Sequence, residues 1–179
     1  MHDSIKLLFE EHSIIVNAID VARQAGSLIG KDDEQYERTV RKLIQFFRQY
    51  ADGFHHHKEE EILFPEMAKK NELLGEGVIK EMFEHHEDFR EMIKGIEKFL
   101  DAKEYSSAQL QLKLYTEALL DHIAVENDEV FQMAESIFDE KELDRINFRF
   151  QDCDNSLGII KNQQLAESAE MLRKENLFL

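Results

Sequence analysis

The sequence contains few of the residues that form turns and crosslinks. Its 179 residues include one proline, seven glycines, one cysteine and no tryptophan. Sheet-rich folds need many turns, and turns favour glycine and proline, so this shortage predicts long helices joined at few corners. The single cysteine, Cys153, excludes a disulfide framework, an all-thiolate zinc site and an iron–sulfur cluster held by this chain alone.

Basic residues and long apolar runs are also scarce. Lys and Arg total 22 against 38 Asp and Glu, which gives a formal net charge of −16. Such an acidic surface repels phosphate backbones and anionic lipid head groups, so we expect neither nucleic acid nor a membrane as a partner. No apolar run approaches the roughly 20 residues of a membrane-spanning helix, and the first residues lack a signal-peptide core. A cytoplasmic helical protein is expected, and its eight histidines are its unusual component.

Apolar residues recur at spacings of three and four along most of the chain, as in helices that bury one face. The pattern predicts five helices, over about 3–26, 34–70, 77–102, 106–136 and 140–174. Short connections favour antiparallel neighbours. We therefore predict an all-α fold, an up-down-up-down four-helix bundle over about 3–136 with an additional C-terminal helix, in one domain over 1–179. Pro65 lacks a backbone N–H and is expected to bend or end the second helix.

Several polar side chains occupy positions that the helical period assigns to the core, namely His12, His86, His122 and Glu126. Residues four apart lie on one face of a helix, so His122 and Glu126 direct an imidazole nitrogen and a carboxylate at the same point. A single core histidine is more often structural, and this pair on its own is compatible with a buried ion pair. Inward histidines on four helices instead favour a metal site.

The second helix offers three overlapping pairs of this kind, His55/Glu59, His56/Glu60 and His57/Glu61. Helical periodicity supports the first and the third pair, and the apolar residues on the face of the third pair follow the helical spacing slightly better. A weak internal repeat favours the first, because HHHKEEEILFPEM (55–67) aligns without gaps with HIAVENDEVFQMA (122–134) and places His55 on His122. We give the repeat more weight, and the other pairs stay open.

Nitrogen and oxygen donors without thiolate suit iron or manganese, and also zinc. Two bridging carboxylates suit a pair of metals better than one ion. Two six-coordinate metals offer about twelve positions. Four histidines, two bridging glutamates and a bridging oxygen species leave about two of these open for a small ligand.

Four stretches together resemble the hemerythrin-like, or HHE cation-binding, family, in its bacterial single-domain form. They are FEEHSIIVNAID around His12, HHHKEEEILFPEM around His55, MFEHHEDF around His86 and DHIAVENDEVFQMA around His122. They occur in family order, and the resemblance covers essentially the whole chain. It implies a bundle that holds two iron ions in an oxo- or hydroxo-bridged centre. The implied ligands are His12, His55, Glu59, His86, His122 and Glu126, with both glutamates bridging.

The chain departs from the oxygen-carrying hemerythrins of animals, which it otherwise resembles. Those proteins place a second histidine where this chain has Met82, and an aspartate where it has Asn127. The site is therefore poorer in nitrogen unless His56, His57 or His85 joins it. This difference makes simple reversible oxygen carriage less favoured and sensing or redox roles more so.

The resemblance allows more than one function. The preferred one is binding of O2 or a related ligand such as NO, for storage, delivery or sensing. The alternatives are a di-iron oxidoreductase acting on peroxide or NO, and an iron donor in iron–sulfur cluster repair. Ferritin-like iron oxidation ranks low, because no histidine has a glutamate three residues before it. Self-association into a homo-oligomer is a further possibility.

Overall fold

The computed structural model describes the backbone of residues 1–176 and the side chains of residues 1–171, and every regular element in this part of the chain is helical. The long helices are α1 (Asp3–Ala25), α2 (Asp33–Phe46), α5 (Val78–Asp101), α6 (Tyr105–Val125), α8 (Glu140–Leu157) and α9 (Ile159–Asn176). A 3-10 turn, η1 (Gly26–Leu28), follows α1, and the short α4 (Glu72–Glu76) precedes α5. The predicted all-α bundle is confirmed.

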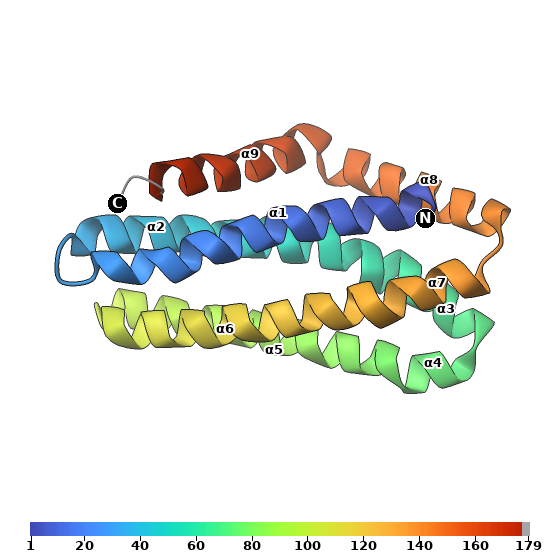
Figure 1. The fold of residues 1–179 in the computed structure, drawn as a ribbon, viewed down its shortest axis with the longest axis horizontal. Coiled ribbons are helices and arrows are strands. Elements are labelled where there is room, and N and C mark those ends of the chain that lie inside the picture. The colour runs from blue at the N-terminus through green and yellow to red at the C-terminus, as the bar shows by residue number, and fades with distance from the viewer. Residues whose placement is uncertain (177–179) are drawn as a thin grey trace.

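Two of these helices continue without a break into further segments. The helix α2 passes through the π-helical segments η2 (Phe47–His56) and η3 (Glu59–Leu63) into α3 (Phe64–Lys70). The helix α6 passes through a π-helical segment, η4 (Glu126–Val130), into α7 (Phe131–Ile137). Each forms one long rod of the bundle (Figure 1).

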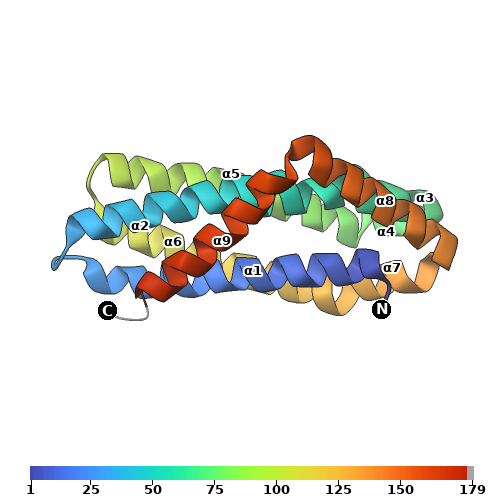
Figure 2. The ribbon, with the colours of Figure 1, turned by 90° about the horizontal axis from the view of Figure 1, so that it is seen from above.

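With α1 and α5 they make four rods, numbered in chain order as α1, α2–α3, α5 and α6–α7, which lie along a common long axis (Figure 1). The helix α5 packs against α6, and α1 contacts both α2 and α6 (Figure 1). The C-terminal helices cover one side of this assembly, and α9 crosses diagonally over α1 and α2 (Figure 2). The bundle therefore has one face shielded by the last part of the chain.

Local sequence signals account for several helix ends. The Asp32 side chain accepts a hydrogen bond from the Gln35 N–H and caps α2. Asp139 and Glu142 form a reciprocal capping box at the start of α8, as the spacing of these two residues predicts.

The chain between 140 and 176 differs from the single fifth helix expected over 140–174. It forms two helices that are separated at Gly158, whose φ is 103°. That conformation is strained for any residue with a side chain, so glycine sets the break between α8 and α9. The prediction of one continuous helix was wrong for this reason.

Pro65 does not end the second rod, which continues to Lys70. The residue lies in the first turn of α3, directly after the π-helical segment η3. Proline removes a backbone donor, which frees a carbonyl one turn earlier. The carbonyl of Glu61 accepts a hydrogen bond of 3.2 Å from Arg149 Nη2 on α8, so a side chain compensates for the missing N–H.

Two apolar clusters fill the bundle, and the polar positions of the four rods lie between them. One cluster contains Ile15, Phe54, Phe89 and Leu119, and the other contains Leu8, Leu63, Met82 and Val130. In each rod, the candidate ligands stand between residues of the two clusters in the sequence. Among the described helices, none is both long enough and apolar enough to cross a membrane. The single-domain organisation, the cytoplasmic location and self-association stay predictions.

Candidate metal centre

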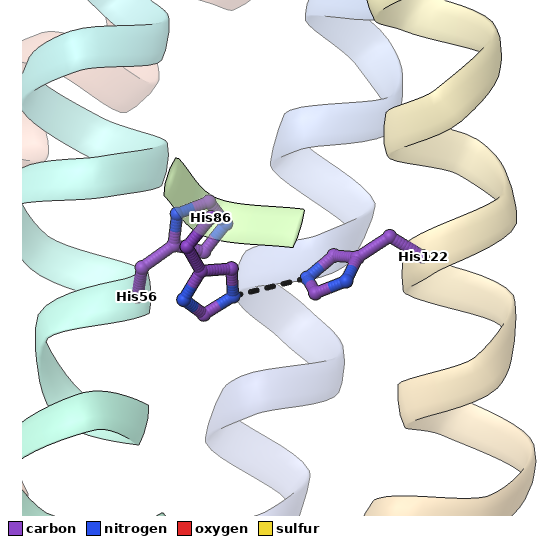
Figure 3. Close-up of side chains that lie close together, drawn as sticks. All are labelled: His56, His86 and His122. Carbon is purple, nitrogen blue, oxygen red and sulfur yellow. Dashed lines mark hydrogen bonds between the residues drawn. The ribbon is translucent and has the colours of Figure 1, made fainter. Parts of the chain in front are cut away.

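Seven buried side chains from four rods converge between the two apolar clusters. They form two groups, one of His56, His86 and His122, and one of His12, His55, Glu59 and Glu126. Within each group, one nitrogen or oxygen atom per residue lies within 4.8 Å of the others. Figure 3 shows the first group, in which His86 and His56 stack at 3.8 Å between ring centroids and His86 Nε2 lies 3.1 Å from His122 Nε2.

Glu126 stands between the two groups. Its Oε2 lies 3.2 Å from Nε2 of both His12 and His122, which belong to different groups. Burial by itself raises the pKa of this carboxyl, but the adjacent His122 and His12 hold it well below its usual range. Glu126 is therefore an ionised carboxylate that faces both groups.

Glu59 has a similar position on the second rod. Its Oε1 lies 3.5 Å from His55 Nε2, and its Oε2 lies 3.7 Å from His86 Nε2 in the other group. Burial and repulsion from Glu126 raise the pKa of Glu59 well above its usual range. Two buried carboxylates that repel each other resist ionising together. A cation between them would relieve that repulsion.

A π-helical segment begins at each of these glutamates. The backbone N–H of Phe64 bonds to the carbonyl of Glu59, and that of Phe131 bonds to the carbonyl of Glu126. Both bonds span five residues rather than four. Single π-turns of this kind are frequent at functional sites, because they rotate the following side chains relative to an α-helix.

Histidines of the second group are held by side chains outside it. His12 Nδ1 lies 2.8 Å from Asn127 Oδ1, and His55 Nδ1 lies 3.0 Å from Glu11 Oε2. Each oxygen accepts the Nδ1–H, which turns the Nε2 atom of the ring inward. Metal-ligating histidines are oriented in this way, by an outer acceptor on the other ring nitrogen.

In the first group, His86 follows the same rule. His86 Nδ1 donates to Glu60 Oε1 at 2.7 Å, whereas His56 Nδ1 lies 3.5 Å from Asp52 Oδ1 without forming a hydrogen bond. Arg90 Nη2 binds both carboxylates, at 2.6 Å from Asp52 and 2.8 Å from Glu60. One guanidinium thus holds the outer partner of His86 and the carboxylate that lies nearest to His56.

Burial keeps several of these rings neutral. It lowers the pKa of His55 to about 4, with His12 adding to the effect, and it lowers the pKa of His56 well below the usual value. The pKa of His86 is also lowered, chiefly by burial. Neutral imidazole is the form that binds metals, so these rings are ready to act as ligands at neutral pH.

The inner atoms of the second group lack hydrogen-bond partners. Among the described residues, none makes a hydrogen bond to His12 Nε2, His55 Nε2, either oxygen of Glu59 or either oxygen of Glu126, although all of these atoms are buried. Buried polar atoms are normally paired, and buried charges are normally neutralised by a partner or a metal. The donor set, imidazole and carboxylate without thiolate, fits iron, manganese or zinc.

The geometry is that of a metal-binding bundle, and comparison with known families agrees. The model of the hemerythrin HHE cation-binding domain matches residues 3–134 of the chain. The chain belongs to this family. The match contains both groups of this HHE domain, whereas α8 and α9 lie beyond it. No curated protein and no solved structure gives a match.

All six ligands predicted from the sequence lie in the two groups, namely His12, His55, Glu59, His86, His122 and Glu126. Their role as ligands stays a prediction. Of the alternative pairs on the second rod, His57 is half-buried and Glu61 is exposed, and neither belongs to a group. Glu60 binds the outer nitrogen of His86 instead of facing the centre.

Sequence reasoning did not place His56 among its preferred ligands. Helical period cannot put the neighbours His55 and His56 on one narrow face, since successive residues of an α-helix differ by about 100°. The π-helical segment η2 changes this geometry, because the N–H of His57 reaches the carbonyl of Asp52, five residues earlier. The run of three histidines was the only signal in the sequence. Met82 lies in an apolar cluster, so the third rod supplies no second nitrogen from that position.

Proposed function

We propose that this HHE domain holds two iron ions and binds O2 or a related small ligand such as NO. One ion would be held by His56, His86 and His122, and the other by His12 and His55. Glu59 and Glu126 would bridge them, within an up-down-up-down arrangement of the four rods. Iron in such a centre supplies reversible binding or reduction of small oxygen and nitrogen ligands.

One observation carries this proposal, namely two adjacent groups of buried nitrogen and oxygen donors with two carboxylates that face both of them. A single ion would use the donors of only one group. A pair of ions with bridging carboxylates would use both groups, and it would balance the negative charge of Glu59 and Glu126.

The number of metal-donor atoms favours binding of a small ligand over catalysis of a reaction. Two six-coordinate ions offer about twelve positions, and five histidines, two bridging glutamates and one bridging oxygen group leave about one of them open. With His56 included, the centre is richer in nitrogen than the sequence alone predicts. A single open position suits one small ligand bound end-on.

A surface pocket of about 360 Å³ supports access for such a ligand. It reaches His56 and is lined by Phe47, Phe89, Ile93 and Tyr115, with Arg48, Asp52, Arg90 and Lys94 completing the lining. The apolar and aromatic part of this lining is compatible with passage of O2 or NO. Entry on this side leads to the three-histidine group first.

The test is anaerobic loading with ferrous iron followed by addition of O2. About two iron atoms per chain are expected, the number that the paired donor sets accommodate. A visible ligand-to-metal absorption band should appear with O2 and disappear on degassing. A stable protein that retains no iron would refute the proposal.

The size of the pocket also supports a second candidate, a di-iron oxidoreductase that acts on peroxide or NO. A volume of about 360 Å³ is larger than a diatomic ligand needs and admits further small reactants. Irreversible oxidation of the loaded protein with sustained peroxide or NO turnover would favour this activity. Transfer of iron to an apo iron–sulfur protein would instead favour the repair role.

A further inference from the structure

A fully buried lysine links the candidate centre to the C-terminal helices. Lys58, on the second rod, has no exposed surface. Its Nζ lies 2.6 Å from Glu11 Oε1 on α1 and 2.7 Å from Asp154 Oδ1 on α8. A buried ammonium needs such partners, because its hydration is lost on folding. Three helices therefore meet at this cation.

The chain of contacts continues to a candidate ligand. Glu11 uses Oε1 for Lys58, and its other oxygen, Oε2, lies 3.0 Å from His55 Nδ1. The Glu11 side chain is itself buried, so rotation of its carboxylate would break both contacts. Lys58 thus fixes the oxygen that orients His55.

Formal charge shows what Asp154 adds to this chain. Without it, the positive Lys58 would cancel the negative Glu11 beside the neutral ring of His55. Asp154 supplies a second negative charge to Lys58, and the three side chains then carry one net negative charge. Glu11 is left as a stronger acceptor for the Nδ1–H of His55, which makes Nε2 a better electron donor.

We propose that Asp154 is a positioning residue for His55, which acts through Lys58 and Glu11 to strengthen one of the two iron sites. The inference rests on the proposed di-iron function and extends it to a residue outside the family match over 3–134. The other outer partners, Asp52, Glu60 and Asn127, come from the rods of the bundle. Asp154 gives α8 a part in the centre.

Docking of α8 does not depend on this ion pair. Leu143, Ile146 and Phe150 of α8 are buried in an apolar cluster with Leu63 and Met67. Asp154 follows them, one turn before the break at Gly158. A neutral residue at 154 is therefore expected to leave the fold and the position of α8 intact.

The experiment compares Asp154→Asn with Asp152→Asn, which removes the same charge from an exposed position of the same helix. Ferrous iron is titrated anaerobically against a competing chelator. In Asp154→Asn, one of the two binding steps should weaken by about 10-fold, the lower end of the effect of outer-shell changes, and the other step should be unchanged. Asp152→Asn should match the wild type.

A second measurement does not need iron. In the metal-free protein, the ¹⁵N resonances of the His55 ring should shift in Asp154→Asn and remain in place in Asp152→Asn. Should Asp154→Asn fail to fold, Asp154→Ser, which is smaller and neutral, is expected to give the same two results. Asp154→Glu, which restores the charge, should recover most of the lost affinity.

The outcomes separate this inference from the proposed function. Two unchanged binding steps together with unchanged His55 resonances in Asp154→Asn would overturn the inference while leaving the di-iron centre intact. Equal weakening of both steps would also overturn it, because it would indicate a general structural role. A wild-type protein that binds no iron would refute the function, and the His55 resonances would still test the link to Asp154.

Discussion

Glu59 and Glu126 are the first residues of two equivalent π-helical segments on different rods, and each segment closes on a phenylalanine N–H. The gapless repeat in the sequence thus has a counterpart in the backbone. Each glutamate follows a histidine by four residues and faces both groups of buried nitrogen atoms. This pairing gives the centre an approximate internal symmetry and leads to the following predictions.

Loss of the His55 ring should remove iron more effectively than loss of the His57 ring. His55 is buried with Nε2 directed at Glu59, whereas His57 is half-buried and outside both groups. His55→Ala is expected to retain about one iron atom per chain or fewer, and His57→Ala about two, because only the first removes a donor. Iron analysis after anaerobic loading and desalting checks this, and the reverse ranking would place the wrong histidine in the centre.

The contribution of His56 to the centre can be tested separately, through the reaction of the iron-loaded protein with O2. Removing this ring should leave about two open coordination positions in place of one. His56→Ala is therefore expected to bind iron less tightly and to oxidise irreversibly, so that the absorption band formed with O2 no longer disappears on degassing. His57→Ala is the matched control from the next position. Fully reversible binding in His56→Ala would show that His56 is not a ligand.

Many of the helices can be predicted from the sequence, because the spacing of apolar residues and the capping residues are local signals. The predicted start of the C-terminal region at Asp139 and Glu142 agrees with the observed capping box. The break at Gly158 was not predicted, since an isolated glycine is tolerated within many helices and only its φ of 103° ends this one.

The sequence predicted most residues of the candidate site, but it did not predict the inclusion of His56 or the contacts around the site. A spacing of four identified His122 with Glu126, and the repeat identified His55 with Glu59. The inclusion of His56 depends on π-helical turns, which an α-helical period does not describe. The pairing of Lys58 with Asp154 joins residues nearly a hundred positions apart, and charge alone does not reveal which acid meets which base.

Arg90 should influence iron affinity although it is not a ligand. Its guanidinium binds Asp52 and Glu60, which face His56 and His86. Arg90→Gln is expected to weaken iron binding by about 10-fold, as for other outer-shell changes, because both carboxylates lose their orientation. Arg48→Gln is the control, since Arg48 lines the same pocket but pairs with Glu97 on the surface. Equal affinities of the two variants, measured by chelator competition, would contradict this role.

The metal-free protein should lose stability in mild acid through His55. Burial lowers the pKa of this ring to about 4 in the folded state, from its ordinary value of 6.5. Between these values the unfolded chain binds a proton that the folded protein does not, so the free energy of unfolding falls as the pH falls from 6.5 to 4. The shift corresponds to about 3 kcal/mol at 1.36 kcal/mol per pKa unit.

Urea unfolding of the metal-free wild type and of His55→Asn at several pH values measures this contribution. Glu59 has a raised pKa and an opposite pH dependence, but it is present in both proteins, so its effect largely cancels in the difference between them. The stability advantage of the wild type over His55→Asn is expected to be largest near pH 7 and to shrink by about 3 kcal/mol towards pH 4. A stability difference that stays constant over this range would mean that His55 has the same pKa in the folded and unfolded states. The conclusion that its buried ring is neutral would then be wrong.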